Sequence, residues 1–221
     1  MAYSVKELFF TLQGEGARAG RPAVFCRFAG CNLWSGRETD RVSAACSFCD
    51  TDFVGTDGEG GGRFADAGCL GARIEEVWCL ETSAREQRLP VRFEADRYVV
   101  FTGGEPLLQL DEALIDACHA RGFEVAVETN GTFPVPDSID WITVSPKPDS
   151  TLVQRSGQEL KLVYPHAVEP ETVAWLDFRE FYLQPLDGPD ALANTERALA
   201  YCRAHPPWKL SLQTHKLIGI R

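Results

Sequence analysis

The 221-residue sequence predicts a mixed α/β fold built on a mainly parallel sheet that is curved into a partial, incomplete barrel. Three observations lead to this prediction. Short apolar runs rich in Val, Ile, Phe and Tyr end at turn residues, as is typical of strands buried on both faces. A helical pattern separates two of these runs and gives a strand–helix–strand unit. A complete eight-stranded barrel takes about 250 residues, so this chain is short for one.

The apolar runs and the amphipathic stretches give the expected elements. The expected strands are residues 23–29, 98–102, 123–128, 141–144, 160–164 and 181–183. A helix is expected over residues 107–121, because four apolar residues spaced three and four apart share one face and Gly122 follows where a helix would stop. Two further helices are expected over residues 70–80 and 189–205.

Two segments interrupt this pattern. Residues 55–62 contain five glycines in eight positions and predict a flexible loop. Residues 81–97 are mostly polar and charged and predict a surface excursion. The strand pattern resumes after each segment, so we expect a single domain over residues 1–221.

The charge balance narrows the class of partner. The net charge is -10, from 22 basic and 32 acidic residues, and this opposes nucleic-acid binding, which depends on clustered Lys and Arg. No run approaches the roughly 18 apolar residues of a membrane helix, and no secretory signal pattern opens the chain. We therefore expect a cytoplasmic protein that binds a small molecule rather than nucleic acid or a membrane.

Eight cysteines are the most informative part of the composition, because disulfides are unexpected without export. Cys31, Cys46 and Cys49 share a loop over residues 30–51, where three thiolates could hold three irons of a [4Fe–4S] cluster and leave the fourth iron open. Structural zinc is the alternative, and it would need a fourth ligand such as Cys26, Cys69 or Cys79. Otherwise the remaining cysteines are expected to be small apolar fillers. These are Cys26, Cys69, Cys79, Cys118 and Cys202.

Polar residues follow four of the expected strands. They lie at residues 28–33, 102–106, 128–131 and 145–147. The carboxyl ends of parallel strands form the edge where α/β sheets bind ligands. Gly103 and Gly104 would let a ligand approach the backbone there, although an ordinary strand-to-helix turn is the alternative.

Taken together, these motifs resemble those of radical S-adenosylmethionine (SAM) enzymes. The likeness rests on the three cysteines of the loop, Thr-Gly-Gly-Glu-Pro at 102–106 and Glu-Thr-Asn-Gly at 128–131. More narrowly, the sequence resembles the family of 7-carboxy-7-deazaguanine synthases. The supporting strings lie at residues 10–16, 27–34, 49–51, 145–147, 184–187 and 213–216. Fourteen residues separate the first two cysteines, which departs from the commonest superfamily spacing, CxxxCxxC.

The resemblance implies a lyase of the queuosine and 7-deazapurine pathway. It would convert 6-carboxy-5,6,7,8-tetrahydropterin to 7-carboxy-7-deazaguanine by a ring contraction that releases ammonia. The implied cofactors are a [4Fe–4S] cluster, SAM and Mg²⁺, and no side chain acts as a catalytic group beyond the cluster and SAM. An electron from the cluster would cleave SAM to a 5′-deoxyadenosyl radical that abstracts hydrogen from the substrate. An external electron donor such as a flavodoxin and a homodimer are also implied.

The same resemblance assigns residues to each ligand. The cluster ligands are Cys31, Cys46 and Cys49. The residues implied to line SAM are Gly104, Ser145, Pro146, Lys147, Gln184, Pro185, Leu186 and Asp187. The residues implied to bind the pterin are Leu12, Gln13, Gly14, Glu15, Arg27, Thr102, His215 and Arg221, the last through its terminal carboxylate. Thr51 is the implied Mg²⁺ ligand, with Asp50 and Asp52 as alternatives.

Two other kinds of protein share part of this pattern. A glycyl-radical activating enzyme has the same cluster and the Gly-Gly-Glu-Pro string but acts on a protein, and the strings at 13–16 and 213–216 argue against it. A noncatalytic iron–sulfur or zinc protein would close all four ligand positions of its metal site.

Overall fold

The computed structural model describes residues 2–86 and 96–221, with the side chains of residues 83–86 excepted. The chain forms two compact units, which are described separately. The first unit comprises Met1–Thr11, Pro22–Glu128 and Pro136–Asp140. The second unit comprises Leu12–Arg21, Thr129–Val135 and Trp141–Arg221. The expectation of a single domain stays a prediction.

The first unit holds a five-strand run in the order β3-β1-β2-β4-β5. The strands are β1 (Tyr3–Leu12), β2 (Pro22–Phe28), β3 (Gly62–Phe64), β4 (Arg97–Gly103) and β5 (Phe123–Thr129). β2 pairs with β4 and β4 with β5 in parallel, whereas β3 runs antiparallel to β1. Apolar side chains fill the interior of β2, β4 and β5, as expected of strands buried on both faces.

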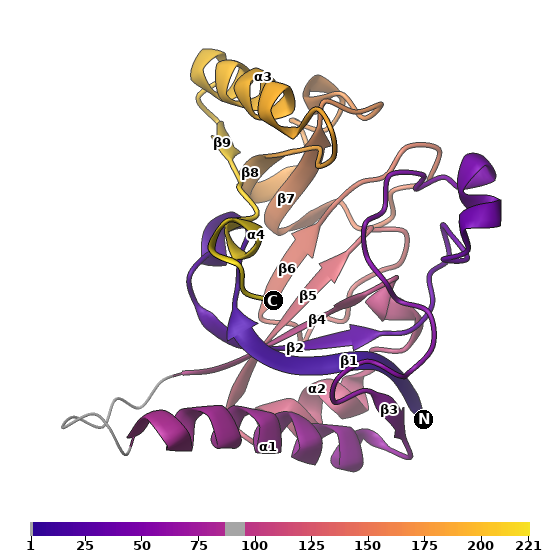
Figure 1. Ribbon diagram of the computed structural model, residues 1–221, viewed down its shortest axis with the longest axis vertical. Helices are drawn as coiled ribbons and strands as arrows, with labels where there is room; N and C mark the ends of the chain where they lie inside the picture. Colours follow the sequence, from indigo (N-terminus) through magenta and orange to yellow (C-terminus); the bar gives the residue numbers. More distant parts are fainter. Residues whose placement is uncertain (1, 87–95) are drawn as a thin grey trace. The chain divides into compact units, whose positions relative to one another are not determined.

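Two helices cover part of the first unit. α1 (Ala67–Glu86) packs against β2 and lies beside α2 (Glu112–His119), as Figure 1 shows. α1 contains the helix expected over residues 70–80, and its buried apolar face consists of Leu70, Ile74, Val77 and Trp78. α2 begins after Asp111, whose carboxylate accepts a hydrogen bond from the Leu114 N–H. This helix is shorter than the predicted 107–121, because Pro106–Leu108 forms a separate 3₁₀ turn.

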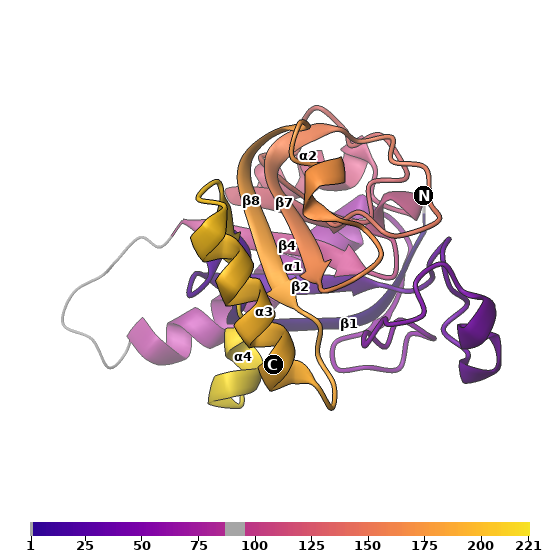
Figure 2. The ribbon, with the colours of Figure 1, turned by 90° about the horizontal axis from the view of Figure 1, so that it is seen from above.

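The second unit is parallel throughout its strand run, β6-β7-β8-β9. Its elements are β6 (Trp141–Val144), β7 (Ser156–Tyr164), β8 (Asp177–Pro185), β9 (Trp208–Leu210), α3 (Ala191–Ala204) and α4 (Thr214–Ile218). Figure 2 shows α3 lying along β8, where the buried Ala198 joins a core that includes Leu160 and Leu183.

Short 3₁₀ helices occur in both units. They are Glu38–Ser43 and Pro106–Leu108 in the first unit, and Gly16–Arg18 and Pro170–Thr172 in the second.

The predicted fold class is confirmed. The chain is mixed α/β with mainly parallel strands, and among the described residues neither strand order returns to its first member, so neither closes into a barrel. All six expected strands are present as β2, β4, β5, β6, β7 and β8. β1 was not predicted because Lys6 and Glu7 interrupt its apolar run. β3 and β9 have three residues each, too few to show a pattern.

The glycine-rich segment forms a loop up to Gly61, as predicted, and Gly62 begins β3. The loop is bonded to β1: the Gly58 N–H donates to the Lys6 carbonyl at 2.9 Å, and the Leu8 N–H donates to the Glu59 carbonyl at 2.8 Å. A Cβ added at Gly60 would lie 2.3 Å from the Leu8 carbonyl oxygen. These glycines therefore permit close backbone packing against β1.

The polar excursion over residues 81–97 is only partly described. Residues 81–86 complete α1 and Arg97 begins β4, so the excursion is shorter than predicted. Residues 87–95 lie outside the described part of the chain. None of the described helices combines the length and apolar character needed to cross a membrane.

Candidate active site

The three cysteines of the predicted cluster loop all lie in the first unit. Cys31 follows β2, and Cys46 and Cys49 lie beyond the 3₁₀ helix Glu38–Ser43. The loop is anchored at its start, where the Gly30 N–H donates to the Phe53 carbonyl at 3.1 Å. Trp34 packs edge-on against the buried Phe53 ring.

Arg41 holds the turn that carries Cys46 and Cys49. Its Nη1 donates to the carbonyls of Ser47 at 2.9 Å and Cys49 at 3.0 Å, and its guanidinium lies 4.1 Å from the centre of the Trp34 ring. Glu38 pairs with the same guanidinium at 2.5 Å. Arg41 thus places a positive charge beside a turn that must carry two thiolates when it binds a metal.

Gly104 packs directly on the start of the cysteine loop. A Cβ at this position would lie 2.1 Å from the Gly30 carbonyl oxygen and 2.7 Å from the Cys31 Cβ, so a side chain is excluded. The Glu105 N–H donates to the same Gly30 carbonyl at 3.0 Å. Burial raises the pKa of the Cys31 thiol, and the neighbouring Glu105 and Cys49 add to this rise although backbone N–H groups partly oppose it.

The donor set on the loop fits a cluster with three protein ligands. Three thiols lie on one loop, whereas structural zinc needs four ligands. Cys26 is fully buried within β2 and Cys69 is exposed on α1, so the filler interpretation is right for Cys26 and wrong for Cys69. Within the described part of the chain, no three His, Cys, Asp or Glu side chains are grouped as a metal site.

Arg27 and Thr102 are brought together by strand pairing. They are register partners on β2 and β4, and Thr102 is buried. Arg27 Nε donates to the Glu7 carboxylate at 2.7 Å, a partner on β1 that the sequence did not reveal.

Asp52, one of the alternative Mg²⁺ ligands, is paired with a lysine. Its carboxylate pairs with Lys6 Nζ at 2.9 Å and accepts a hydrogen bond from the Val54 N–H. The hydrogen bond from Lys6 lowers the pKa of Asp52. The assignment of Mg²⁺ to Thr51, with Asp50 and Asp52 as alternatives, stays a prediction.

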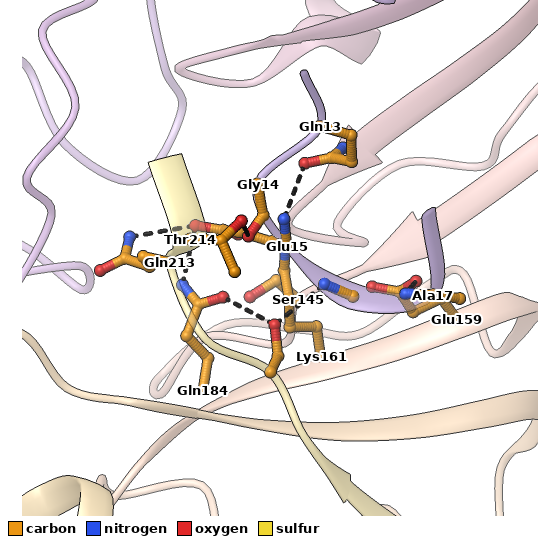
Figure 3. A network of polar contacts seen from close by, with 12 residues as sticks. Gln13, Gly14, Glu15, Ala17, Ser145, Glu159, Lys161, Gln184, Gln213 and Thr214 are labelled. Carbon is orange, nitrogen blue, oxygen red and sulfur yellow. Dashed lines mark hydrogen bonds and ion pairs between the residues drawn. The ribbon is translucent and has the colours of Figure 1, made fainter. Parts of the chain in front are cut away.

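The second unit holds the predicted pterin-binding turn, with Glu15 at its centre (Figure 3). Lys161 Nζ on β7 donates to Glu15 Oε2 at 2.5 Å. Two amides converge on the other oxygen, since Gln213 and Gln184 donate to Oε1 at 3.0 and 3.1 Å. Of these three donors, only Gln184 was among the predicted site residues.

The backbone of the same turn is also fixed. The Gly16 N–H donates to Ser211 Oγ and the Ala17 N–H to Glu159 Oε2, each at 2.9 Å. His215 packs against Gly14, where a Cβ would lie 2.1 Å from the ring Nδ1 and only glycine fits. The structure therefore brings Gln13, Gly14, Glu15, Gln184 and His215 together.

The charges around Glu15 explain its ionisation. Burial alone would raise the pKa of this carboxyl group, but the ion pair with Lys161, the hydrogen bond from Gln213 and the charge of His215 outweigh it and hold the pKa below its usual value. Lys161 and Glu159 lie two residues apart on β7 and share one face. A lysine inside the apolar run 160–164 was the available signal for this network.

The other predicted SAM residues lie in the second unit. Lys147 Nζ donates to Ser145 Oγ at 2.6 Å, and the Ser145 N–H donates to the Thr129 carbonyl at 2.8 Å. Burial and the charge of Lys147 lower the pKa of His166. Asp187 is paired with Lys216 at 2.6 Å.

Five further predicted residues are placed by the structure, and their roles stay predictions. Leu12 ends β1, Pro185 ends β8, and Pro146 lies between Ser145 and Lys147. Arg221 follows α4 and is exposed. Leu186 is tied to the fold, because its N–H donates to the Tyr164 carbonyl at 2.8 Å.

A mainly parallel α/β fold with a three-cysteine loop at the end of a buried strand defines the class as radical SAM enzymes, which carry a [4Fe–4S] cluster and SAM. No family model matches the chain. The chain is 64% identical over 221 residues to 7-carboxy-7-deazaguanine synthase of Bordetella pertussis and 62% identical to that of Caulobacter vibrioides, with 100% of every chain covered. It therefore belongs to the 7-carboxy-7-deazaguanine synthase family.

A solved structure supports this assignment. The crystal structure of QueE from Escherichia coli matches with a TM-score of 0.65 and 28% identity, over 97% of this chain and 95% of that chain. The confirmed family removes the activating-enzyme and noncatalytic alternatives considered from the sequence.

Proposed function

We propose that this chain converts 6-carboxy-5,6,7,8-tetrahydropterin to 7-carboxy-7-deazaguanine with loss of ammonia. The observation that carries the proposal is the turn at Gln13–Glu15, where a mostly buried carboxylate is held ionised by Lys161 and aimed by amides. Such a carboxylate suits the N–H edge of a pterin, because hydrogen bonds to an ionised acceptor are the stronger ones.

Glu15 keeps capacity for a substrate hydrogen bond. An ionised carboxylate has about four acceptor sites, and the donors Lys161, Gln184 and Gln213 use three of them. Leu12, Gln13, Gly14 and His215 would complete the contacts to the ring. The Arg221 terminal carboxylate is proposed to close the site.

Arg27 and Thr102 are proposed to bind the substrate carboxylate. Glu7 accepts a hydrogen bond from Arg27 Nε, and a guanidinium has two terminal nitrogens with which Arg27 could bind a carboxylate. The buried Thr102 hydroxyl lies on the paired position of the next strand.

Cys31, Cys46 and Cys49 are proposed to hold the [4Fe–4S] cluster. The cluster and SAM, when bound, supply the radical that starts the ring contraction. Gly104 is proposed, on the family's pattern, to contact SAM through its backbone. The remaining proposed contacts to SAM are Ser145, Pro146, Lys147, Gln184, Pro185, Leu186 and Asp187.

Further components are proposed on the family's pattern. Thr51 would share Mg²⁺ with water and the substrate, since Mg²⁺ is seldom held by protein ligands alone. An external donor such as a flavodoxin would reduce the cluster. We also propose a cytoplasmic homodimer that binds neither nucleic acid nor a membrane.

Anaerobic reconstitution followed by an assay tests the function. The reconstituted protein, with SAM, a reductant, Mg²⁺ and the carboxytetrahydropterin, should release 7-carboxy-7-deazaguanine, detected by chromatography and mass. An intact cluster, shown by iron and sulfide content, without this product would overturn the proposal.

A further inference from the structure

A lysine lies inside a strand of the second unit where apolar residues surround it in sequence. Lys161 is the third residue before the end of β7, between Leu160 and Leu162, which are both buried. Its side chain is only 8% exposed, whereas the exposed Lys209 on β9 is 51% exposed. A buried ammonium group is unfavourable unless it is paired, so a partner must offset the burial.

That partner is the carboxylate proposed to bind the substrate. Lys161 Nζ lies 2.5 Å from Glu15 Oε2, and the Glu15 side chain is 15% exposed. The other two donors to this carboxylate, Gln184 and Gln213, are neutral amides that both bind Oε1. Lys161 is therefore the one ammonium group that hydrogen-bonds to Glu15 in the described part of the chain (Figure 3).

The same face of β7 also supports the backbone of the turn. Glu159 Oε2 accepts the hydrogen bond from the Ala17 N–H at 2.9 Å. A Cβ at Gly16 would lie 2.0 Å from Glu159 Oε1, so the turn packs closely on this second carboxylate. β7 thus supports the turn at two points, one on its backbone and one on the Glu15 side chain.

We propose that Lys161 is a positioning residue for the substrate: it keeps Glu15 ionised and fixes the direction of its carboxylate, so that the site selects a ring edge that donates N–H groups. This inference rests on the proposed function, because it concerns the same site. A protonated Glu15 would present an O–H donor to the N–H donors of the substrate. A rotated Glu15 carboxylate would no longer point its oxygens at those N–H groups. Lys161 acts through Glu15 and touches no reacting atom.

The test compares K161M and K161R with K209M in the reconstituted holoenzyme. Lys209 is the matched control, since it pairs with Glu180 on the surface of the same unit. K161M should raise KM for the carboxytetrahydropterin about 10- to 100-fold, the range of a lost charge-assisted hydrogen bond, with kcat changed far less. K161R keeps the positive charge and should therefore keep most of the wild-type affinity for the substrate. K209M should have the KM of the wild type.

The pH profile separates positioning from a structural role. Without Lys161 the burial of Glu15 should raise its pKa, while Gln213 and His215 still oppose that rise, so the KM penalty of K161M should grow as the pH falls from about 8 to about 6. The wild-type KM should stay level over this interval. A KM for K161M equal to wild type at both pH values overturns the inference, and so does a penalty that K161R shares in full.

A second variant covers the case in which K161M does not fold. The double variant E15Q/K161M removes both charges of this ion pair, so neither is left buried without the other. If Lys161 acts through Glu15, the double variant should have nearly the same KM as E15Q alone. A double variant with a further tenfold loss relative to E15Q overturns the inference.

An infrared measurement keeps this inference distinct from the proposed function. Difference spectra against E15Q should show a protonated-carboxyl band for K161M at about pH 6 and none for wild type. Failure of the wild type to make the product would overturn the proposed function alone. A protonated Glu15 in the wild type would overturn the positioning role, whatever the turnover.

Discussion

The cysteine loop and the Glu15 turn are held in different ways. The contacts within the cysteine loop are local: Arg41 binds Glu38, Ser47 and Cys49, which lie three to eight residues away in sequence. The donors to Glu15 come from 146 to 198 residues away. The part of the loop around Arg41 is therefore held mainly by its own residues, whereas the Glu15 turn depends on residues from distant parts of the second unit.

The two regions are therefore suited to different tasks, substrate recognition at the turn and metal binding at the loop. The turn is preorganised for one shape of substrate, because buried polar networks are rigid when every member is satisfied. The loop carries the three thiols that are proposed to bind the cluster.

The largest effect is expected from C31A. This variant should lose the cluster and all turnover because one of three ligands is gone, yet keep its secondary structure if the loop is independent of the sheet. C202A is the matched control, since the half-buried Cys202 lies on α3 and should change neither. Iron and sulfide content, product formation and circular dichroism measure the outcome. Unfolding of C31A would contradict the comparison.

A smaller but clear loss is expected from G104A. The new methyl group would meet the Gly30 carbonyl at 2.1 Å, and overpacking of this kind costs about 1–3 kcal/mol. Thermal unfolding should show the loss, together with poorer cluster loading. G68A in α1 is the control and should be neutral or slightly stabilising, since its nearest contact is an Asp66 oxygen at 3.3 Å. Equal behaviour of the two variants would mean that Gly30 and Cys31 move freely.

The Glu15 turn should show a specific pH dependence of stability. The folded-state pKa of Glu15 is lowered, so its stabilising contribution is present above the ordinary value of 4.5 and is lost as pH falls through the folded-state pKa. The difference in unfolding free energy between wild type and E15Q should therefore shrink as the pH falls below about 4.5. Denaturant titrations at several pH values measure it. A difference that grows toward acid would contradict the assigned direction.

The smallest effect is expected from R41M. Its ion pair with Glu38 lies on the surface, so the global stability should change little. Proteolysis within the loop should nevertheless become several-fold faster, because the Cys46–Cys49 turn loses its anchor. R73M, which breaks an i,i+3 pair with Glu76 on α1, is the control and should leave that rate unchanged. Equal rates in all three proteins would show that Arg41 does not hold the loop.

The sequence predicts what depends on local pattern. The six buried strands and the apolar face of α1 follow from runs and spacings of apolar residues. The polar strand ends are predicted for the same reason, since Gly103 ends β4 and Ser145 follows β6. Residues of the site that lie on matched motifs could therefore be named in advance.

What depends on partners far apart in sequence could not be predicted. Glu7 beside Arg27 and Lys161 beside Glu15 become neighbours only through strand pairing and the return of the chain. β1 was missed because its charged residues have buried or paired roles that composition does not reveal, as for Lys6 with Asp57.

The glycine-rich segment before β3 has a practical consequence for labelling the protein. By composition, residues 55–61 look like a permissive place for an affinity tag or a fluorophore. Gly58 and Glu59 instead form hydrogen bonds to β1, and Gly60 has no room for a Cβ. An insertion there would separate the segment from β1 and leave backbone groups of that strand without their partners, so a probe belongs elsewhere on the chain.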